Sequence, residues 1–557
     1  MRTRLLIPLF ALLTAVAAHA QADPKHGHDH DADGTDNHLR CGTFGWIAAN
    51  STRDWKDGSI SRAPFSIACD IRQAKQRNLL TRDSHFRIHW DEAGRDAVPT
   101  ADANSNGLPD FIDSVDYYLE YTWNVEINEY GYLPPLPDGR GLGPEIDVYL
   151  CDLNREYYGL ARPEEDNPTG PNTVNGFLVL ENDFIGYPSP GIAGLRVTIA
   201  HEFHHIIQFS RYRYDFSQAS LYEATSVWFE RKIAPDVRDY LQYVREFLLA
   251  PQDVGLSTQN VLGSAAGYAH VLFMEYLEKK IGIAAIRRIW ERFASEGDMF
   301  KGIDLELREH DMNLENAFCE FAEWCYYTGT RATETKYFDD ARIFPTMRAA
   351  VTRLFNHEDL LIQGLLYPLG FGLYQIIVPS DSSGGRDTID FLITNARTDF
   401  GHGGPFLRKD SFALELTEMN RDGYRPLASN GDTLFFKLRA ESPHFCVNPL
   451  FGGKAISIVA THVSPQPFIN DGGSSLVFGL NLAREQVQHA KLWIYSAALT
   501  RVREVEQTEL LSFNNQLGVL WDGRDHNGQL VPSGIYIYEL SINDGPPTLG
   551  KFAVIRK

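Results

Sequence analysis

The chain has 557 residues, and 43% of them are hydrophobic, which is enough apolar material for several packed domains rather than one. Its 52 basic and 73 acidic residues give a formal net charge of −21. This acidic surplus excludes nucleic acid and anionic membrane surfaces as expected partners, because both are negatively charged themselves. The same surplus suits a protein that works in an extracellular setting.

The first twenty residues have the three parts of a secretory signal peptide. Residues 1–4 are charged, residues 5–18 are apolar, and residues 18–20 form a small-x-small cleavage site. The apolar run is too short to cross a membrane as a helix, and we find no other run of that length. The sequence therefore predicts an exported protein, secreted or on the cell surface, without a transmembrane segment.

The segment after the cleavage site, residues 21–37, is rich in histidine and aspartate. It cannot bury apolar surface, so we expect a disordered, solvated tail, with loose metal binding as the alternative. Residues 38–84 are open to two interpretations, a prosegment or an N-terminal extension packed on the enzyme.

Six cysteines follow the signal peptide, and an even number in an exported protein predicts disulfides. They are Cys41, Cys69, Cys151, Cys319, Cys325 and Cys446. Cys319 and Cys325 are close in sequence, and Cys41 could close a local loop with Cys69, but the pairing stays open. Free, buried thiols are the alternative.

Residues 85–180 read as alternating strands and loops, with strands expected at 85–90, 146–150 and 176–180. Between them lies a stretch with the residue types of an EF-hand-type calcium loop. Its ligand positions and bend are filled by Asp102, Asn104, Asn106, Gly107, Leu108 (through its carbonyl), Asp110 and Asp113. Asp113 stands where Glu is usual, and a shorter carboxylate reaches the ion less well. An amphipathic helix is expected over 114–130, and an Asx-rich turn without Ca²⁺ is the alternative.

The most informative motif is His201-Glu202-Phe203-His204-His205, which contains H-E-x-x-H. Residues four apart on a helix project from one face, so His201 and His205 can bind one Zn²⁺. Glu202 then stands where a carboxylate can take a proton from water at the metal. His204 points off that face and is expected to be a neighbour. The alternative is a buried polar cluster without metal.

The flanks of the motif predict that it lies on a core helix. An apolar stripe at helical spacing consists of Ile192, Leu195, Ile199, Phe203 and Ile206, and Pro190 and Gly191 mark its start. A loop is expected at 211–217 and a second helix at 220–230. Glu223 on that helix, eighteen positions after His205, is the expected third ligand, with an exposed helix carboxylate as the alternative. Glu230 is the competing carboxylate and better suited to orienting a ligand.

These motifs resemble those of gluzincin metallopeptidases, the clan of thermolysin. More closely, the loop at 102–113, the strand at 147–150, H-E-F-H-H-x-x-Q-F and E-A-T-x-x-W-x-E resemble a family of secreted bacterial metalloproteases. The resemblance covers about residues 85–345. It implies His201, His205 and Glu223 as zinc ligands and Glu202 as the base. It also implies that Tyr268 or His270 stabilises the oxyanion. Core packing for Tyr268 and a capping or surface role for His270 are the alternatives.

The remainder of the chain is helical from 234 to about 325 and β-rich from 346. Short alternating strands, such as 372–378, 387–394 and 433–438, predict a β-sandwich at 346–462. The strings at 521–528 and 533–538 resemble the Ig-like fold of flagellar hook-capping proteins and type IX secretion sorting domains. That resemblance implies a secretion machinery or cell surface as partner. Asp522 and Asp525 are expected in a hairpin turn rather than a Ca²⁺ site.

Together these features predict an α+β protein with a thermolysin-like zinc metallopeptidase domain followed by two β-sandwich (Ig-like) domains. The expected division is 1–20, 21–84, 85–345, 346–462 and 463–557. The expected function is hydrolysis of peptide bonds in a protein or peptide substrate, with Zn²⁺ as cofactor and Ca²⁺ as a second ion. A cell-surface binding or adhesion protein with a non-catalytic peptidase-like domain is the alternative, and a zinc hydrolase of another substrate is a third.

Overall fold

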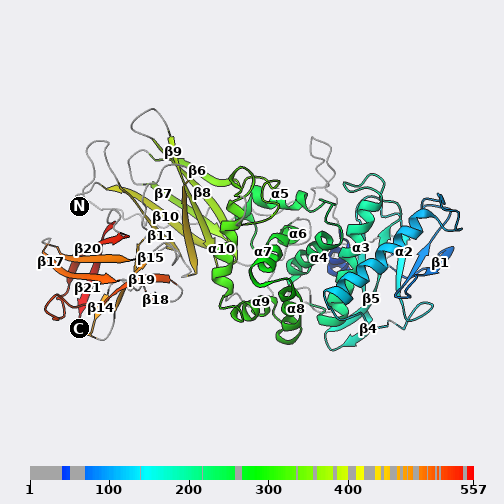
Figure 1. The fold of residues 1–557 in the computed structure, drawn as a ribbon, viewed down its shortest axis with the longest axis horizontal. Coiled ribbons are helices and arrows are strands. Elements are labelled where there is room, and N and C mark those ends of the chain that lie inside the picture. The colour runs from blue at the N-terminus through cyan, green and yellow to red at the C-terminus, as the bar shows by residue number, and fades with distance from the viewer. Residues whose placement is uncertain are drawn as a thin grey trace, which may run out of the picture.

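Figure 1 shows the computed structural model, with a β-sheet at one end, helices in the middle and further sheets at the other end. The structure describes residues 41–50, 69, 71–137, 139–215, 218–257, 266–333, 337–355, 360–379, 386–398, 409–419, 433–440, 444–451, 461–464, 468–472, 475–480, 489–497, 500–507, 511–513, 516–543 and 548–557. The predicted signal peptide and the histidine-rich tail lie outside the described residues.

A mixed five-stranded sheet lies in the N-terminal half of the molecule. Its strands are β1 (Arg77–Leu80), β2 (Phe86–Trp90), β3 (Ile146–Cys151), β4 (Gly159–Gly170) and β5 (Thr173–Glu181), in the order β1-β2-β3-β5-β4. The three central strands run parallel and are almost wholly buried, whereas β1 and β4 are antiparallel edges. The three predicted strands are confirmed. The sequence pattern did not predict β1 or β4.

Helices pack on this sheet and carry the candidate site. They are α1 (Thr43–Asn50), α2 (Asp110–Trp123), the π-helix η1 (Asn124–Glu129), α3 (Ile192–Ile207), the π-helix η2 (Gln208–Tyr212) and α4 (Ala219–Ile233). The predicted motif helix is α3, and its stripe is buried except for Ile192, which is 38% exposed at the first turn. The predicted loop at 211–217 begins later than expected. Burial of Phe209 and Tyr212 keeps the backbone helical through η2.

The helical middle of the chain completes one large core with the sheet. Its elements are α5 (Leu241–Leu249), η4 (Pro251–Asp253), α6 (Ala266–Ala269), α7 (Val271–Ile281), α8 (Ala284–Glu296), α9 (Met299–Arg308), α10 (Leu314–Tyr326) and η5 (Gly329–Arg331). Trp228 and Trp290 are among the largest fully buried side chains. Because this core runs from the N-terminal sheet into the helices, α3 and α4 are held on both sides.

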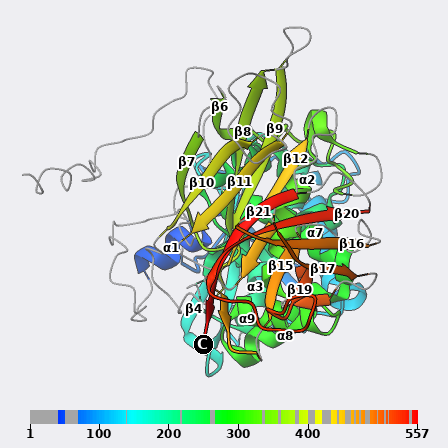
Figure 2. The same cartoon turned by 90° about the vertical axis from the view of Figure 1, so that its left-hand side faces the viewer.

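Two pairs of facing sheets follow the helices. The first pair has β11-β10-β7 against β12-β9-β8-β6, and the second has β13-β15-β19-β18 against β14-β21-β20-β16-β17. Their bounds are β6 (Ala349–Leu354), β7 (Leu360–Leu366), β8 (Gly370–Pro379), β9 (Arg386–Asn395), β10 (Asp410–Met419), β11 (Thr433–Ala440), β12 (Phe445–Phe451), β13 (Thr461–Ser464), β14 (Phe468–Asn470), β15 (Leu476–Leu480), β16 (Ala490–Ser496), β17 (Arg501–Gln507), β18 (Leu511–Phe513), β19 (Gln516–Trp521), β20 (Gly534–Ile542) and β21 (Thr548–Arg556). Each pair shares its own apolar core, as a β-sandwich does. In Figure 2 the two sandwiches face the viewer, in front of the helices.

Two disulfides link distant parts of the chain, Cys69 with Cys151 and Cys319 with Cys446. The short-range pairings suggested by sequence proximity are therefore wrong, since Cys41 and Cys325 are free and buried. The fold brings Cys69 to β3 and Cys319 on α10 to β12, which sequence distance does not reveal. Such bonds are typical of exported proteins.

The α+β class is confirmed, with helices on a mixed sheet followed by several β-sheets. A thermolysin-like fold, the Ig-like character of the sandwiches and the domain boundaries remain predictions. In the part of the chain that the structure describes, no helix is both long enough and apolar enough to span a membrane.

Candidate metal centre

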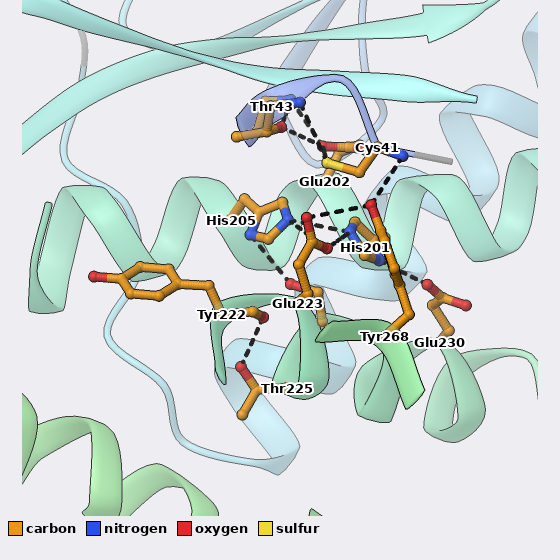
Figure 3. A network of polar contacts seen from close by, with 12 residues as sticks. Cys41, Thr43, His201, Glu202, His205, Tyr222, Glu223, Thr225, Glu230 and Tyr268 are labelled. Atoms are coloured by element: carbon orange, nitrogen blue, oxygen red, sulfur yellow. Dashed lines mark hydrogen bonds and ion pairs between the residues drawn. The ribbon is translucent and has the colours of Figure 1, made fainter. Parts of the chain in front are cut away.

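The two motif histidines and Glu223 meet between α3 and α4 (Figure 3). The Nε2 atoms of His201 and His205 lie 3.1 Å apart. Glu223 Oε2 lies 2.8 Å from the Nε2 of His201 and 3.6 Å from that of His205. All three side chains are buried. The structure thus brings together the three residues that the motif spacing predicts as ligands.

Partners behind the rings fix which nitrogen faces the centre. His205 Nδ1 lies 2.7 Å from Gln208 Oε1, and an amide oxygen can only accept, so Nδ1 carries the hydrogen. Gln208 is itself oriented because its Nε2 donates to the Tyr222 carbonyl (3.1 Å) and Thr225 Oγ1 (2.9 Å). His205 Nε2 therefore presents a lone pair to the centre.

His201 is oriented in the same way by a carboxylate. Its Nδ1 lies 2.7 Å from Glu230 Oε1, and a carboxylate likewise accepts. Glu230 thus takes the orienting position predicted for it, behind the ring rather than at the centre. Metal-binding histidines generally donate their second ring nitrogen to such a partner.

The arrangement at the centre fits a cation. Glu223 Oε2 is buried, and two imidazole nitrogens face it at 2.8 and 3.6 Å. Tetrahedral zinc with ligand bonds near 2 Å would separate neighbouring ligand atoms by about 3.3 Å. The three separations of 2.8, 3.1 and 3.6 Å lie on both sides of that value. A divalent ion would satisfy all three atoms at once.

In the metal-free protein, a proton on His201 takes the place of the metal ion. Burial opposes a charge on His201, but Glu223 and Glu230 outweigh it and raise the pKa of His201 to about 10. Burial likewise works against ionised Glu223, yet His201 lowers the pKa of Glu223 to about 2. The metal-free pair is therefore an ion pair, and metal binding must displace the proton.

Glu202 stands beside this centre. It is 1% exposed, and its Oε2 accepts hydrogen bonds from Thr43 Oγ1 (3.0 Å) and the backbone N–H of Ala161 on β4 (2.8 Å). Glu202 is outside the group of residues whose donor atoms converge. The role of Glu202 as a base remains a prediction.

A fourth donor, which the sequence analysis did not assign, is Cys41. One donor atom each of Cys41, His201, His205 and Glu223 lies within 4.8 Å of the others, and all four residues are buried. Nothing in the spacing of the motif points to a cysteine 160 positions upstream of His201. One other cluster of this kind occurs among the described residues, Cys69 with Asp96 and Cys151, but its two thiols form a disulfide.

Tyr268 lies at the centre, and His270 does not join it. Tyr268 Oη donates to Glu223 Oε1 (3.3 Å) and accepts from the backbone N–H of Cys41 (3.3 Å). His270 is buried, its ring packs on Phe247 at 5.7 Å, and neither ring nitrogen has a hydrogen-bond partner among the described residues. Burial lowers the pKa of His270 to about 3. The alternative of a surface role for His270 is therefore wrong, whereas His270 does occupy the N-cap position of α7, without a side-chain hydrogen bond to the helix.

His204 points away from the centre, as its place in the motif predicts. Its Nδ1 lies 2.8 Å from Glu126 Oε2 on η1, and both side chains are fully buried. Burial raises the pKa of Glu126 well above its usual value and lowers that of His204 well below it. The pair is thus an uncharged contact between helices.

The candidate calcium loop runs into the first turn of α2 and is exposed or half-buried. Asp102 accepts from the N–H groups of Asn106 and Gly107, and Asp113 accepts from the side-chain amides of Asn104 and Asn106. Asp110 accepts from the N–H of residue 103. These bonds make an Asx-rich turn. A Ca²⁺ ion held by Asp102, Asn104, Asn106, Leu108, Asp110 and Asp113 remains a prediction.

The turn at Asp522 and Asp525 is likewise held by backbone donors. Asp522 Oδ1 accepts from the N–H of Arg524, and Asp525 Oδ1 accepts from those of Asn527 and Gln529. This is the hairpin-type turn that the sequence predicts.

Residues 74–323 match a protein family, DUF6055, which is described as a family of unknown function. No curated protein matches the chain. Among solved structures, the crystal structure of dimeric latent PorU from Porphyromonas gingivalis aligns at 13% identity with a TM-score of 0.18. The alignment covers 36% of this chain and 20% of that one, and an overlap of this size does not define a shared fold. Every donor of the metal centre except Cys41 lies within the residues that match the family.

Proposed function

We propose that the chain is an exported zinc metallopeptidase, with His201, His205 and Glu223 as ligands and Glu202 as general base. The observation that carries this proposal is the convergence of two oriented imidazole nitrogens and one buried carboxylate oxygen beside a second carboxylate. This donor set is the one used by catalytic zinc in hydrolases that activate water. The disulfides agree with a place outside the cytoplasm.

The residues around the centre have separate roles in hydrolysis. A bound zinc ion would supply Lewis-acid chemistry, polarising the scissile carbonyl and making water more acidic. Glu202 takes the proton of the attacking water and delivers it to the leaving amine nitrogen. Tyr268 Oη, next to Glu223 Oε1, can donate a hydrogen bond to the oxygen that becomes negative. Glu230 and Gln208 hold the histidine rings in place.

The edge strand β4 favours a polypeptide as substrate over a small molecule. It passes beside Glu202, because the N–H of Ala161 donates to Glu202 Oε2. The carbonyl of Gly159 on the same strand already accepts from the N–H of Gly42, a residue of a separate chain segment. An extended backbone can thus pair with this edge within reach of the base.

The competing function is a binding or adhesion protein whose metal centre is structural. The presence of Cys41 favours it, since four protein donors form a closed set and structural zinc sites are closed. The two functions differ in whether Cys41 can dissociate from the metal.

The test measures zinc and hydrolysis together. The purified protein should hold one zinc per chain by elemental analysis, and His201→Ala and His205→Ala should lose it. His310→Ala, an exposed histidine after α9, is the matched control and should keep it. Hydrolysis of a denatured protein is then assayed with Cys41 present and with Cys41 replaced by alanine. If the protein holds zinc but neither the wild type nor Cys41→Ala hydrolyses the substrate, the peptidase function is wrong and the binding function is retained.

A further inference from the structure

The segment at residues 41–43 lies inside the candidate metal centre. Cys41 is buried, and its Sγ belongs to the group that includes donor atoms of His201, His205 and Glu223. Its backbone N–H donates to Tyr268 Oη at 3.3 Å. Figure 3 shows this segment on one side of the two histidines and α4 with Glu223 on the other. Cys41 thus faces the position that a three-ligand site would leave open.

The same segment covers the residues that hydrolysis needs. Cys41 bridges Gly159 in parallel pairing, and the N–H of Gly42 donates to the Gly159 carbonyl at 2.9 Å. Thr43 Oγ1 donates to Glu202 Oε2 at 3.0 Å and accepts from the N–H of Ala161 at 2.9 Å. The proposed base and the adjoining edge of β4 are therefore both occupied by residues 41–43.

Helix α1 fixes the segment in this position. The ring of Phe44 packs edge-on against His205 at 5.4 Å and against Tyr222 at 6.1 Å. The guanidinium of Arg162 on β4 lies 4.1 Å from the ring centre of Trp46. Cation–π and aromatic contacts of this kind stabilise the docked helix, which packs on β4 (Figure 2). The segment is thus built into the site rather than laid across its mouth.

We propose that Cys41 is the fourth ligand of the metal and that residues 41–50 hold the enzyme latent. This proposal rests on the proposed function and adds its regulation. The Cys41 thiol binds as a thiolate, so one proton is released and nothing is oxidised or reduced. Its sulfur takes the coordination position that substrate and water require, and Thr43 blocks the base. Activity then requires that the segment leave.

The covalent framework permits this departure. Cys41 is not in a disulfide, so non-covalent contacts and one coordination bond retain residues 41–50. Downstream, Cys69 is joined to Cys151 on β3. Hydrolysis of the chain anywhere between the segment and Cys69 would therefore release the inhibitory residues and leave the remainder linked to its sheet.

Cobalt-loaded full chain tests the proposal by absorption spectroscopy, with Cys41→Ala compared with Cys325→Ala. Cys325 is the other free, buried cysteine and lies in α10. Wild type and Cys325→Ala should show a thiolate-to-cobalt charge-transfer band, and Cys41→Ala should lack it. Acetohydroxamate, which binds an open metal position, should change only the spectrum of Cys41→Ala. Hydrolysis of a denatured protein should rise about tenfold or more in Cys41→Ala, since the latent state no longer dominates.

The outcomes separate this proposal from the proposed function. A wild-type spectrum without the thiolate band, or with the hydroxamate response of Cys41→Ala, would overturn latency, whether or not the protein hydrolyses its substrate. The expected spectra without hydrolysis in any variant would establish Cys41 as the closing ligand and overturn the peptidase function. Cys41→Ser, which preserves side-chain size, provides the same readouts if the alanine variant does not fold.

Discussion

Three glutamates near the candidate metal centre differ in the atoms that they contact, and the proposed function gives each a different role. Glu223 meets the two histidine nitrogens, and Glu230 lies behind one ring. Glu202 instead accepts from Thr43 and Ala161, outside the converging donor atoms. Each role can therefore be tested by the same change, carboxylate to amide, with distinct expected results.

Glu202→Gln should keep zinc and the fold but lose hydrolysis. An amide cannot take the proton of the attacking water, whereas its oxygen can still accept the bond from the Ala161 N–H. General-base losses are typically about 10²–10⁴-fold. Zinc content and hydrolysis rate are measured together, in the wild-type chain and in Cys41→Ala. If Glu202→Gln hydrolysed the substrate as fast as the parent protein, Glu202 would not be the general base.

Glu223→Gln should release zinc, and Glu230→Gln should weaken it less. Glu223 offers a lone pair to the ion itself, whereas Glu230 only orients His201, and loss of such outer partners costs about 10- to 100-fold in affinity. Competition with a chromogenic chelator measures both affinities. If Glu230→Gln had the larger effect, the assignment of the two carboxylates would have to be exchanged.

The sequence predicted the local half of this centre and missed the distant half. His201 and His205 follow from helical periodicity, and Glu223 from a second helix close behind, so short-range rules reach them. Cys41 lies at the centre because residue 41 pairs with β4. Sequence periodicity does not predict this long-range contact. Tyr268 reached the centre while His270 packs on Phe247, because the turn between α6 and α7 separates them.

At the scale of elements, burial on both faces explains which strands the sequence predicted. β3 and β5 are largely apolar strands in the centre of the sheet, and β2 alternates Phe86, Ile88 and Trp90 with polar residues. β4 is an edge strand with Pro163, Pro168 and several carboxylates, and its burial alternates only in part. The apolar pattern therefore did not predict β4, although the N–H of Ala161 on this strand donates to Glu202.

The end of β5 gives a pH-dependent contribution to stability. Glu181 Oε2 accepts from the Leu153 N–H and the Tyr187 hydroxyl, each at 2.8 Å, and burial raises the pKa of Glu181 from 4.5 to about 7. The folded chain then binds more protons than the unfolded chain between these values, so stability falls as pH rises through 7. Glu181→Gln keeps an acceptor but does not titrate.

We therefore expect Glu181→Gln to reduce the difference in stability between pH 5 and pH 8, by on the order of 2 kcal/mol. Scanning calorimetry at the two pH values measures it as a smaller shift in Tm. Glu309→Gln, on an exposed carboxylate after α9, is the control and should leave the shift unchanged. An unaltered shift in Glu181→Gln would contradict the assignment.

At the scale of the whole molecule, the last sandwich has a core of its own. Its buried residues, from Phe468 to Val554, form a cluster separate from the main core and from the first sandwich. Its first strand, β13, begins at Thr461 and pairs with β15, and the boundary after residue 462 remains a prediction. Alternating patterns predicted that strands occur here, but not which strand opens the module.

A chain that ends at residue 460 should retain zinc and, in the Cys41→Ala background, hydrolysis. The reason is that no donor of the metal centre lies in the removed part, which has its own core. If the resemblance to sorting domains is functional, the shortened chain should lose export or surface display, measured as protein outside the cell. Loss of zinc on shortening would instead show that the module supports the candidate metal centre.

The bond between Cys319 and Cys446 changes how the molecule would carry a pulling force. If the C-terminal module is attached to a surface, tension on the helical part of the molecule enters the chain near β12. It then passes through the sulfur atoms directly to α10, without crossing the strands β6 to β11 that lie between them in sequence. Those strands are mechanically in parallel with a covalent link. The first sandwich can therefore act as a rigid spacer under load, and reducing the bond would turn it into an extensible one.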